Sequence, residues 1–167
     1  MKIQTISDWL NETLSTSKND WMIVVFKVGG DFVDNSGRKR QINNSLSLNK
    51  FIRSVDWTIL DLRRRLKSDM KFVSFFGGNE ETQVQTHIHS FLEIPKSTNY
   101  EFIEKTLTEN FDIYSKRNFK TNVESSVWTD RLDMNNYRSH VYYCSRSEGK
   151  TFKYGNEKVI LSKSCLL

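Results

Sequence analysis

The longest helical pattern in the sequence constrains the fold most strongly. From Ser47 onward, apolar residues recur every three or four positions and form one stripe, made of Phe51, Ile52, Val55, Ile59, Leu62 and Leu66. This spacing predicts an amphipathic helix. The cations Arg63, Arg64 and Lys67 fall largely off the stripe. Because the apolar face of such a helix has to be buried against a second layer, the neighbouring segments decide the architecture.

Strand-like segments lie on both sides of this helix. Trp21 to Val28 is β-branched and aromatic, which is typical of a buried strand, and Gly29-Gly30 ends it. After the helix, Met70 to Phe76 and Val84 to Ile94 flank a polar turn, and this pattern predicts a β-hairpin. The polar segment Asp31 to Ser45 predicts a hairpin or loop that projects from the sheet.

The remaining elements complete a mixed domain. Thr98 and Glu101 form a capping box that begins a helix after Pro95. We also expect a short helix, an exposed strand, another helix and a last strand, in that order, at Ser7 to Leu14, Asp112 to Lys120, Asn135 to Ser145 and Thr151 to Leu161. This order favours an α+β fold with an antiparallel sheet and helices at its sides. With 167 residues, the chain is expected to form a single domain over 1–167.

Charge is consistent with a polyanionic partner without requiring one. The net charge is +5, and cations gather in Arg38-Lys39-Arg40, Arg63-Arg64-Arg65 and Lys116-Arg117. Such clusters attract nucleic acid, but a basic helix face is also common as a solvated surface. Charge alone leaves both interpretations open.

The cellular compartment is suggested by the absence of a disulfide framework, a membrane helix and a signal peptide from the sequence. The two cysteines, Cys144 and Cys165, form no disulfide framework and no Cys-x-x-Cys pair, so we expect a reducing intracellular location. No stretch approaches the roughly 20 apolar residues of a membrane helix, and no signal peptide is visible, so no membrane partner is expected.

A histidine pair is the first candidate site. Residues two apart on a strand share a face, so His87 and His89 should project side by side, while Ile88, Leu92 and Ile94 point the other way toward a helix. Two imidazoles on adjacent rungs can bind one metal ion through neutral ring nitrogens. The alternative is a chance pair on a solvated strand, although the chain has only 3 histidines.

A tyrosine-rich helix is the second candidate site. If the segment around it is helical, His140, Tyr143 and Arg146 are spaced by three and lie along one face. A phenol, with a pKa of about 10, needs a metal ion or a cation beside it to act as a nucleophile. Tyr142 and Tyr143 point about 100° apart, so only one can face a given site, and the other is expected to be an ordinary packing residue.

These two segments, in this order, resemble the HUH endonuclease family, and in particular the replication initiators of circoviruses and related small circular single-stranded DNA viruses. The stretch from Phe72-Val73-Ser74 through Gly78-Asn79-Glu80-Glu81 to His87-Ile88-His89 is similar to the family's second motif. Tyr143-Cys144-Ser145-Arg146 is similar to its third motif, Tyr-x-x-Lys. The resemblance extends over about Trp21 to Gly155, and it implies a five-stranded antiparallel, RRM-like sheet with flanking helices.

The resemblance also implies a reaction and its participants. His87 and His89 would hold Mg²⁺ or Mn²⁺, with Glu80, Glu81 or His140 as the third ligand. Tyr143 would be the nucleophile, and Arg146 would replace the family lysine. The chain would nick and join single-stranded DNA at an origin hairpin, forming a 5′-phosphotyrosine that starts rolling-circle replication. Cations that would contact the DNA are Arg38, Lys39, Arg40, Lys116 and Arg117.

Other expectations concern partners and location. No G-x-x-x-x-G-K-[ST] phosphate loop occurs, so no helicase domain is expected, and a separate helicase would unwind the DNA. The protein would act in the host nucleus if its source is a eukaryotic virus, and otherwise in the cytoplasm. Other functions are also compatible with the sequence. One is a non-catalytic single-stranded nucleic-acid-binding module, and another is a metal-dependent nuclease or transposase-like relative that uses the same histidines.

Overall fold

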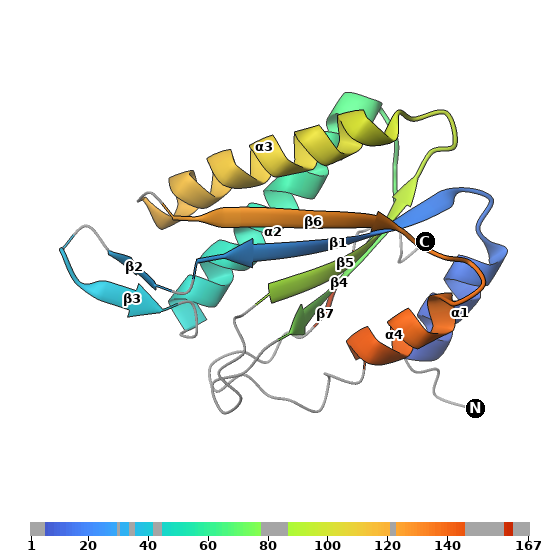
Figure 1. Cartoon of the computed structure of the whole chain (residues 1–167), viewed down its shortest axis with the longest axis horizontal. Coiled ribbons are helices and arrows are strands. Elements are labelled where there is room, and N and C mark those ends of the chain that lie inside the picture. Colours follow the sequence, from blue (N-terminus) through green and yellow to red (C-terminus); the bar gives the residue numbers. More distant parts are fainter. Residues whose placement is uncertain are drawn as a thin grey trace.

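An antiparallel sheet lies between two pairs of helices in the computed structural model, which describes residues 6–29, 31–33, 36–41, 45–77, 87–120, 123–145 and 159–161. The strand order is β6-β1-β5-β4-β7 (Figure 1). The strands span Asp20–Val28 (β1), Phe72–Gly77 (β4), His87–Ile94 (β5), Ser125–Arg131 (β6) and Val159–Leu161 (β7). The helices span Ile6–Thr16 (α1), Ser45–Leu66 (α2), Tyr100–Phe119 (α3) and Tyr137–Ser145 (α4). The predicted α+β class is confirmed.

Strand β1 lies inside the sheet and is apolar on both faces. Met22, Val24 and Phe26 point to one side and are fully buried. Trp21, Ile23 and Val25 point to the other side and are also buried. β1 pairs with β5 on one edge and with β6 on the other. A strand that is buried on both faces reads as a continuous apolar run, which is why the sequence predicted it correctly.

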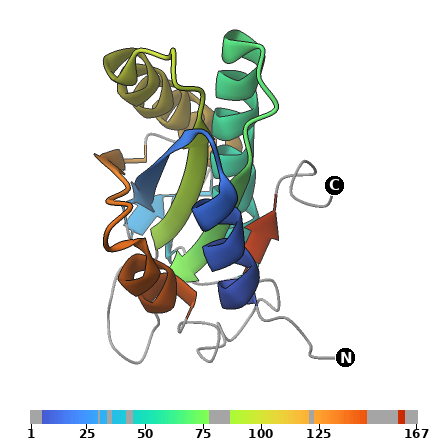
Figure 2. The same cartoon turned by 90° about the vertical axis from the view of Figure 1, so that its right-hand side faces the viewer.

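Helices α2 and α3 cover one face of the sheet (Figure 2). The predicted stripe of α2 is buried there, and Ile88 and Leu92 of β5 belong to the same core, as expected. Phe111 of α3 meets Phe26 of β1 edge to face, with ring centroids 4.9 Å apart. Aromatic pairs of this kind stabilise a fold by more than the burial of their apolar area, so this contact holds α3 against β1.

A polar seam joins α2 to α3 and shows that they run antiparallel. The side-chain amide of Asn118 donates to Ser54 Oγ at 3.0 Å, and that of Asn110 donates to Asp61 Oδ2 at 2.6 Å. The residue numbers of these contacts rise along α2 while they fall along α3, so the two helices run in opposite directions. Because these buried groups are hydrogen-bonded, the seam fixes the lateral register of the two helices.

Helices α1 and α4 cover part of the other face. Leu10 and Leu14 of α1 and Val141 of α4 pack against the sheet residues Val73 and Phe91. In Figures 1 and 2, α1 and α4 lie side by side below the sheet, away from α2 and α3. They leave the first residues of β5 partly accessible to solvent, since His87 and His89 are half-buried.

The predicted polar hairpin is confirmed as strands β2 (Asp31–Val33) and β3 (Lys39–Gln41). It extends beyond the end of β1, as Figure 1 shows. Gly37 in its turn has φ +77°, a left-handed conformation that glycine adopts without strain. The hairpin follows Val28, so it leaves the sheet at the same end as His87, which pairs with Lys27.

Two sequence predictions around α3 are wrong. Asp112 to Lys120 is not a strand, because α3 runs to Phe119. Phe111, Ser115 and Phe119 are buried and continue the four-residue spacing begun by Ile103 and Leu107. The strand that precedes α4 is instead β6, whose polar sequence SSVWTDR is half-buried or exposed throughout and therefore lacks an apolar signal.

The cap of α3 also differs from the prediction. Asn99, not Thr98, is the N-cap, and its side-chain oxygen accepts hydrogen bonds from the backbone N–H groups of Glu101 (2.9 Å) and Phe102 (3.3 Å). Elsewhere, the predicted β4–β5 hairpin partners pair antiparallel, and their turn lies outside the described residues. No helix in the described part of the chain is long and apolar enough to cross a bilayer.

The cap gives a direct test of the helix boundary. Asn99→Ala removes the acceptor for two backbone N–H groups, so the free energy of unfolding should fall by about 1 kcal/mol. Thr98→Ala is the matched control and should change it by less than about 0.5 kcal/mol. Urea denaturation followed by circular dichroism measures both, and equal losses in the two variants would contradict the assignment of Asn99.

Candidate functional site

Two rows of side chains cross the sheet on the face that α4 partly covers. In the first row, His89 of β5 pairs with Val25 of β1, which in turn pairs with Trp128 of β6. In the second row, His87 pairs with Lys27, which pairs with Ser126. Cross-strand partners lie within about 5 Å at Cβ, so each row brings three strands to one place.

The histidine pair has the predicted geometry. The rings of His87 and His89 lie side by side, with centroids 4.7 Å apart and planes at 74°. Their positions two residues apart on β5 hold them on the same face, and the burial of Ile88 between them fixes that face. The two rings are close enough for one ion to lie between them.

His89 is held in its neutral form. Burial, together with the neighbouring His87 and Lys27, lowers its pKa to about 4. An imidazole binds a metal ion only when a ring nitrogen is free of its proton. At neutral pH, His89 is therefore already in the state that a metal ligand requires.

Tyr143 stands beside the pair. Its ring centroid lies 6.0 Å from that of His89, and it is 53% exposed. Tyr142 is 67% exposed and does not line the same cavity. The rotation of α4 explains the difference, because Tyr137, Val141 and Cys144 form its buried stripe. Burial raises the pKa of the Cys144 thiol to about 12, so Cys144 is an inert core residue.

A cavity of about 410 Å³ joins these groups. Its walls include both histidines, Tyr143, Lys27 and Trp128. Trp128 is 56% exposed, which is unusual for so large an apolar side chain. The cavity thus combines neutral imidazoles, a phenol, an ammonium group and an aromatic face, and its volume lies within the range of small-ligand sites.

A complete ligand set for a metal ion is not formed by the described residues. No group of three or more His, Cys, Asp and Glu side chains gathers among them. His140, one of the three candidates for the third ligand, forms no such group with the histidine pair and is an exposed residue of α4. The alternative third ligands Glu80 and Glu81 lie outside the described residues, as does Arg146.

The structure separates the basic residues that were expected to contact DNA. Arg38 is exposed in the β2–β3 hairpin, at the same end of the sheet as His87, and Lys39 and Arg40 belong to β3. Lys116 and Arg117 lie in the last turn of α3, a helix that covers the opposite face. Lys116 also forms an ion pair with Asp112 at 2.7 Å. These two residues therefore belong to the helix layer on the other face of the sheet from the histidines.

Two cavity residues received no role from the sequence. Lys27 is the one charged residue that follows Trp21 in an otherwise apolar strand, and this interruption was a usable signal. Trp128 gave no comparable signal, because β6 itself was not recognised. Their proximity to the histidines depends on the register of β1 with its two neighbours.

Comparison with known proteins finds a remote structural likeness. The chain is similar to the N-terminal nuclease domain of Minute virus of mice non-structural protein-1, with 14% sequence identity, a TM-score of 0.45, and 93% of this chain and 70% of that chain covered. That domain is described with Zn²⁺ coordination in its active-site pocket and with DNA recognition at the origin of replication. No family model and no curated protein match this chain.

The lowered pKa of His89 predicts an acid-sensitive fold. An ordinary histidine titrates near 6.5, whereas folded His89 titrates near 4, so the unfolded chain takes up a proton first as the pH falls. Stability is therefore lost between these values, by on the order of 2 to 3 kcal/mol from about pH 7 to about pH 4.5. His89→Asn lacks this contribution.

The test compares urea denaturation of the metal-free wild type and His89→Asn across this pH range. The free energy of unfolding of the wild type should fall relative to that of the variant as the pH decreases. Parallel curves would show that His89 titrates normally in the folded protein. His140→Asn, at an exposed position of α4, is the matched control and should parallel the wild type.

Proposed function

We propose that this protein is an HUH-type endonuclease and strand transferase that nicks and rejoins single-stranded DNA to initiate rolling-circle replication. The observation that carries the proposal is the convergence of His87, His89 and Tyr143 on one cavity, with the His89 and Tyr143 rings 6.0 Å apart. In the same proposal, the short strand β7 completes the five-stranded sheet of that family.

The histidines fit the metal that this function needs. Two neighbouring imidazoles, one of them kept neutral by burial, are suitable ligands for a divalent cation such as Mg²⁺ or Mn²⁺. We propose Glu80 or Glu81 as the acidic third ligand, because each lies shortly before β5 in the sequence. When bound, such a cation would polarise the scissile phosphate.

Tyr143 is proposed as the nucleophile. Its phenolic oxygen would attack phosphorus, forming the tyrosyl–phosphate bond while the bond to the 3′-oxygen breaks. The phenolic proton can pass to solvent, because Tyr143 is half-exposed at the cavity edge. The products are a 5′-phosphotyrosine and a free 3′-hydroxyl, and attack by a 3′-hydroxyl on the phosphotyrosine rejoins the strand.

Lys27 and Trp128 extend the proposal to the DNA itself. Lys27 lines the cavity and is the cross-strand partner of His87, so its ammonium group can stabilise negative charge on the phosphoryl oxygens. The exposed Trp128 ring offers a surface on which an adjacent base can stack. Arg38 of the β2–β3 hairpin, together with Lys39, Arg40 and the family-equivalent Arg146, would contact the backbone further along the strand. A separate helicase would open the duplex.

The central test is covalent trapping. Wild-type protein incubated with 5′-labelled and 3′-labelled single-stranded oligonucleotide libraries and Mn²⁺, Mg²⁺ or Zn²⁺ should form an adduct stable in denaturing gels. Tyr143→Phe should reduce its yield at least about a thousandfold, because it removes the nucleophile. Tyr142→Phe, the adjacent and more exposed tyrosine, should retain adduct formation within about twofold.

The metal requirement is checked in the same assay. EDTA and His87→Ala should abolish the adduct, while His140→Ala on the exposed side of α4 should not. Adduct formation that persists in Tyr143→Phe, or that moves to Tyr142, would contradict the assignment of the nucleophile. Cleavage without any adduct would instead indicate a metal-dependent nuclease that activates water.

Lys27 provides a second, independent test. Lys27→Met should slow single-turnover adduct formation by about a hundredfold, since one charge-stabilising group is lost. The same change should raise the pKa of His89, because Lys27 lowers it in the wild type. Lys105→Met, at an exposed position of α3, is the control, and NMR titration of the histidine ring protons reads the pKa. An unchanged rate would place Lys27 outside the reaction.

A second function is favoured by one feature of the same cavity. An exposed tryptophan on a sheet beside a lysine is also how single-strand-binding modules are built, and the described residues do not complete a metal site. Binding of labelled oligonucleotides that is lost in Trp128→Ala, together with no adduct under any metal condition, would favour that non-catalytic function.

A further inference from the structure

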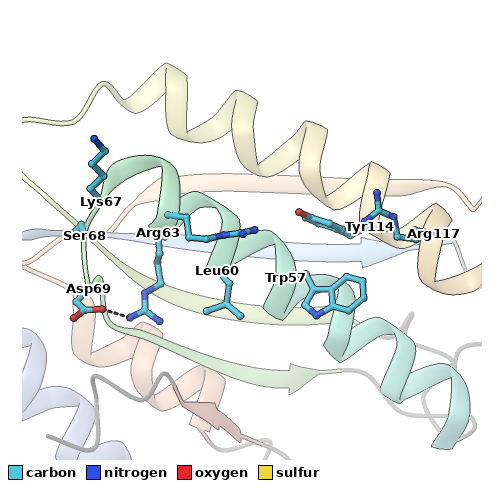
Figure 3. Close-up of a pocket in the computed structure, with 9 residues that line it drawn as sticks. Trp57, Leu60, Arg63, Lys67, Ser68, Asp69, Tyr114 and Arg117 are labelled. Atoms are coloured by element: carbon cyan, nitrogen blue, oxygen red, sulfur yellow. Dashed lines mark hydrogen bonds and ion pairs between the residues drawn. The ribbon is translucent and has the colours of Figure 1, made fainter.

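A second, larger cavity lies on the other side of the sheet from the histidines. It has a volume of about 790 Å³ and is lined by one stripe of α2 and by Tyr114 and Arg117 of α3 (Figure 3). Nothing in the proposed nicking reaction uses it. We call it the α2–α3 groove and define it by Trp57, Leu60, Arg63, Lys67, Tyr114 and Arg117.

The groove is elongated, with different chemistry at its ends and middle. Trp57 and Leu60 lie on one side of α2, and Lys67 directly follows its last residue, Leu66. The ten-residue step from Trp57 to Lys67 corresponds to about 15 Å of helix. Figure 3 shows Trp57 beside Tyr114 and Arg117 at one end, Lys67 at the other end, and Leu60 between them. Apolar surface therefore extends from Leu60 to the end formed by Trp57 and Tyr114, and a cation stands at each end.

The apolar part is open to solvent. Leu60 is 37% exposed, although leucine on a helix layer is usually covered. Trp57 and Tyr114 are half-buried and meet edge to face at 5.7 Å, so they form a rigid wall rather than two mobile rings. An exposed apolar surface with a polar rim is typical of a protein interaction site.

The charged part favours an acidic partner. Arg63 is paired with Asp69 at 2.9 Å. In the described part of the chain, however, Lys67 and Arg117 have no carboxylate partner. The two ends of the groove therefore present positive charge that its own acids do not neutralise, and carboxylates of a bound partner would be attracted to both ends.

The aromatic contacts favour a peptide over a nucleic acid. The guanidinium group of Arg53 lies over the Trp57 ring at 5.9 Å, and that of Arg117 lies over the Tyr114 ring at 5.5 Å. A nucleobase would have to displace these cations to stack on the ring faces that they cover. An aliphatic side chain needs only the space beside Leu60, so it can bind without breaking these contacts.

We propose that the α2–α3 groove binds an acidic amphipathic helix of a partner protein. Its apolar side chains would lie against Leu60, Trp57 and Tyr114, and its carboxylates would meet Lys67 at one end and Arg117 at the other. A length of about 15 Å matches about three turns of a helix lying along α2. This proposal is independent of the nicking reaction, because the groove shares no residue with the histidine cavity.

The test measures binding of a labelled synthetic peptide to the full chain by fluorescence anisotropy. The probe is a helix-forming peptide of about 14 residues with leucines at helical spacing and glutamates on the flanks. Leu60→Glu and Lys67→Glu should each weaken binding by about tenfold or more. Matched controls are Ile113→Glu, an exposed apolar residue of α3 outside the groove, and Lys105→Glu, and both should bind within about twofold of wild type.

A scrambled peptide and a single-stranded DNA probe test whether the groove prefers an amphipathic helix. A scrambled peptide of the same composition should bind at least about tenfold more weakly, since its apolar stripe is lost. Equal binding of the scrambled peptide, or unchanged binding in Leu60→Glu, would overturn the proposal. Tighter binding of oligo(dT) that is lost in the same groove variants would also overturn it and would make the groove a nucleic-acid surface.

Two further measurements distinguish a loss of peptide binding from a loss of the fold or of the proposed nicking activity. Circular dichroism of each variant confirms that the fold is intact, which is expected because Leu60 and Lys67 are exposed. Adduct formation at Tyr143 should be unchanged in Leu60→Glu. Loss of peptide binding with normal adduct formation therefore supports the groove. Retained peptide binding in Leu60→Glu overturns the groove proposal whatever the adduct yield, and a failure of the wild type to form an adduct concerns the proposed nicking function alone.

Discussion

The antiparallel register between β1 and β5 is the constraint on which the rest of the structure depends. It places Lys27 opposite His87 and Val25 opposite His89, so the cation and both imidazoles share one face. A shift by one residue would turn every side chain of one strand to the other face. The shift is prevented because the reverse faces of both strands are buried under α2 and α3, where Phe26 pairs with Ile88.

The two faces of the sheet are covered to different extents, and this difference creates the site. One face is closed by α2 and α3, which are held together by a hydrogen-bonded seam and by Phe111. The other face is closed by α1 and α4 only as far as Phe75 and Phe91, so the histidines at the start of β5 border a cavity. The buried stripe of α4 then sets its rotation and brings Tyr143 to the cavity.

Elements with a complete periodic pattern of apolar residues were predicted correctly, and elements held in place by contacts with distant segments were not. The α2 stripe and the apolar run of β1 were both correct, since burial requires such patterns. The edge strand β6 was missed because its pairing with β1, rather than its own apolar residues, holds it in place. The cap at Asn99 was assigned one residue too early, since two neighbouring polar residues can each cap a helix and only the backbone path selects one.

The sequence by itself determined the α+β class, the shared face of His87 and His89, and the short list of tyrosines, because alternation and helical spacing are properties of the chain. Only the tertiary structure decided that Tyr143 rather than Tyr142 stands at the histidines, that Lys27 and Trp128 join them, and that a second groove lies on the helix layer. These are relations between residues far apart in sequence. They depend on strand register and helix rotation, which are set by how the layers bury one another.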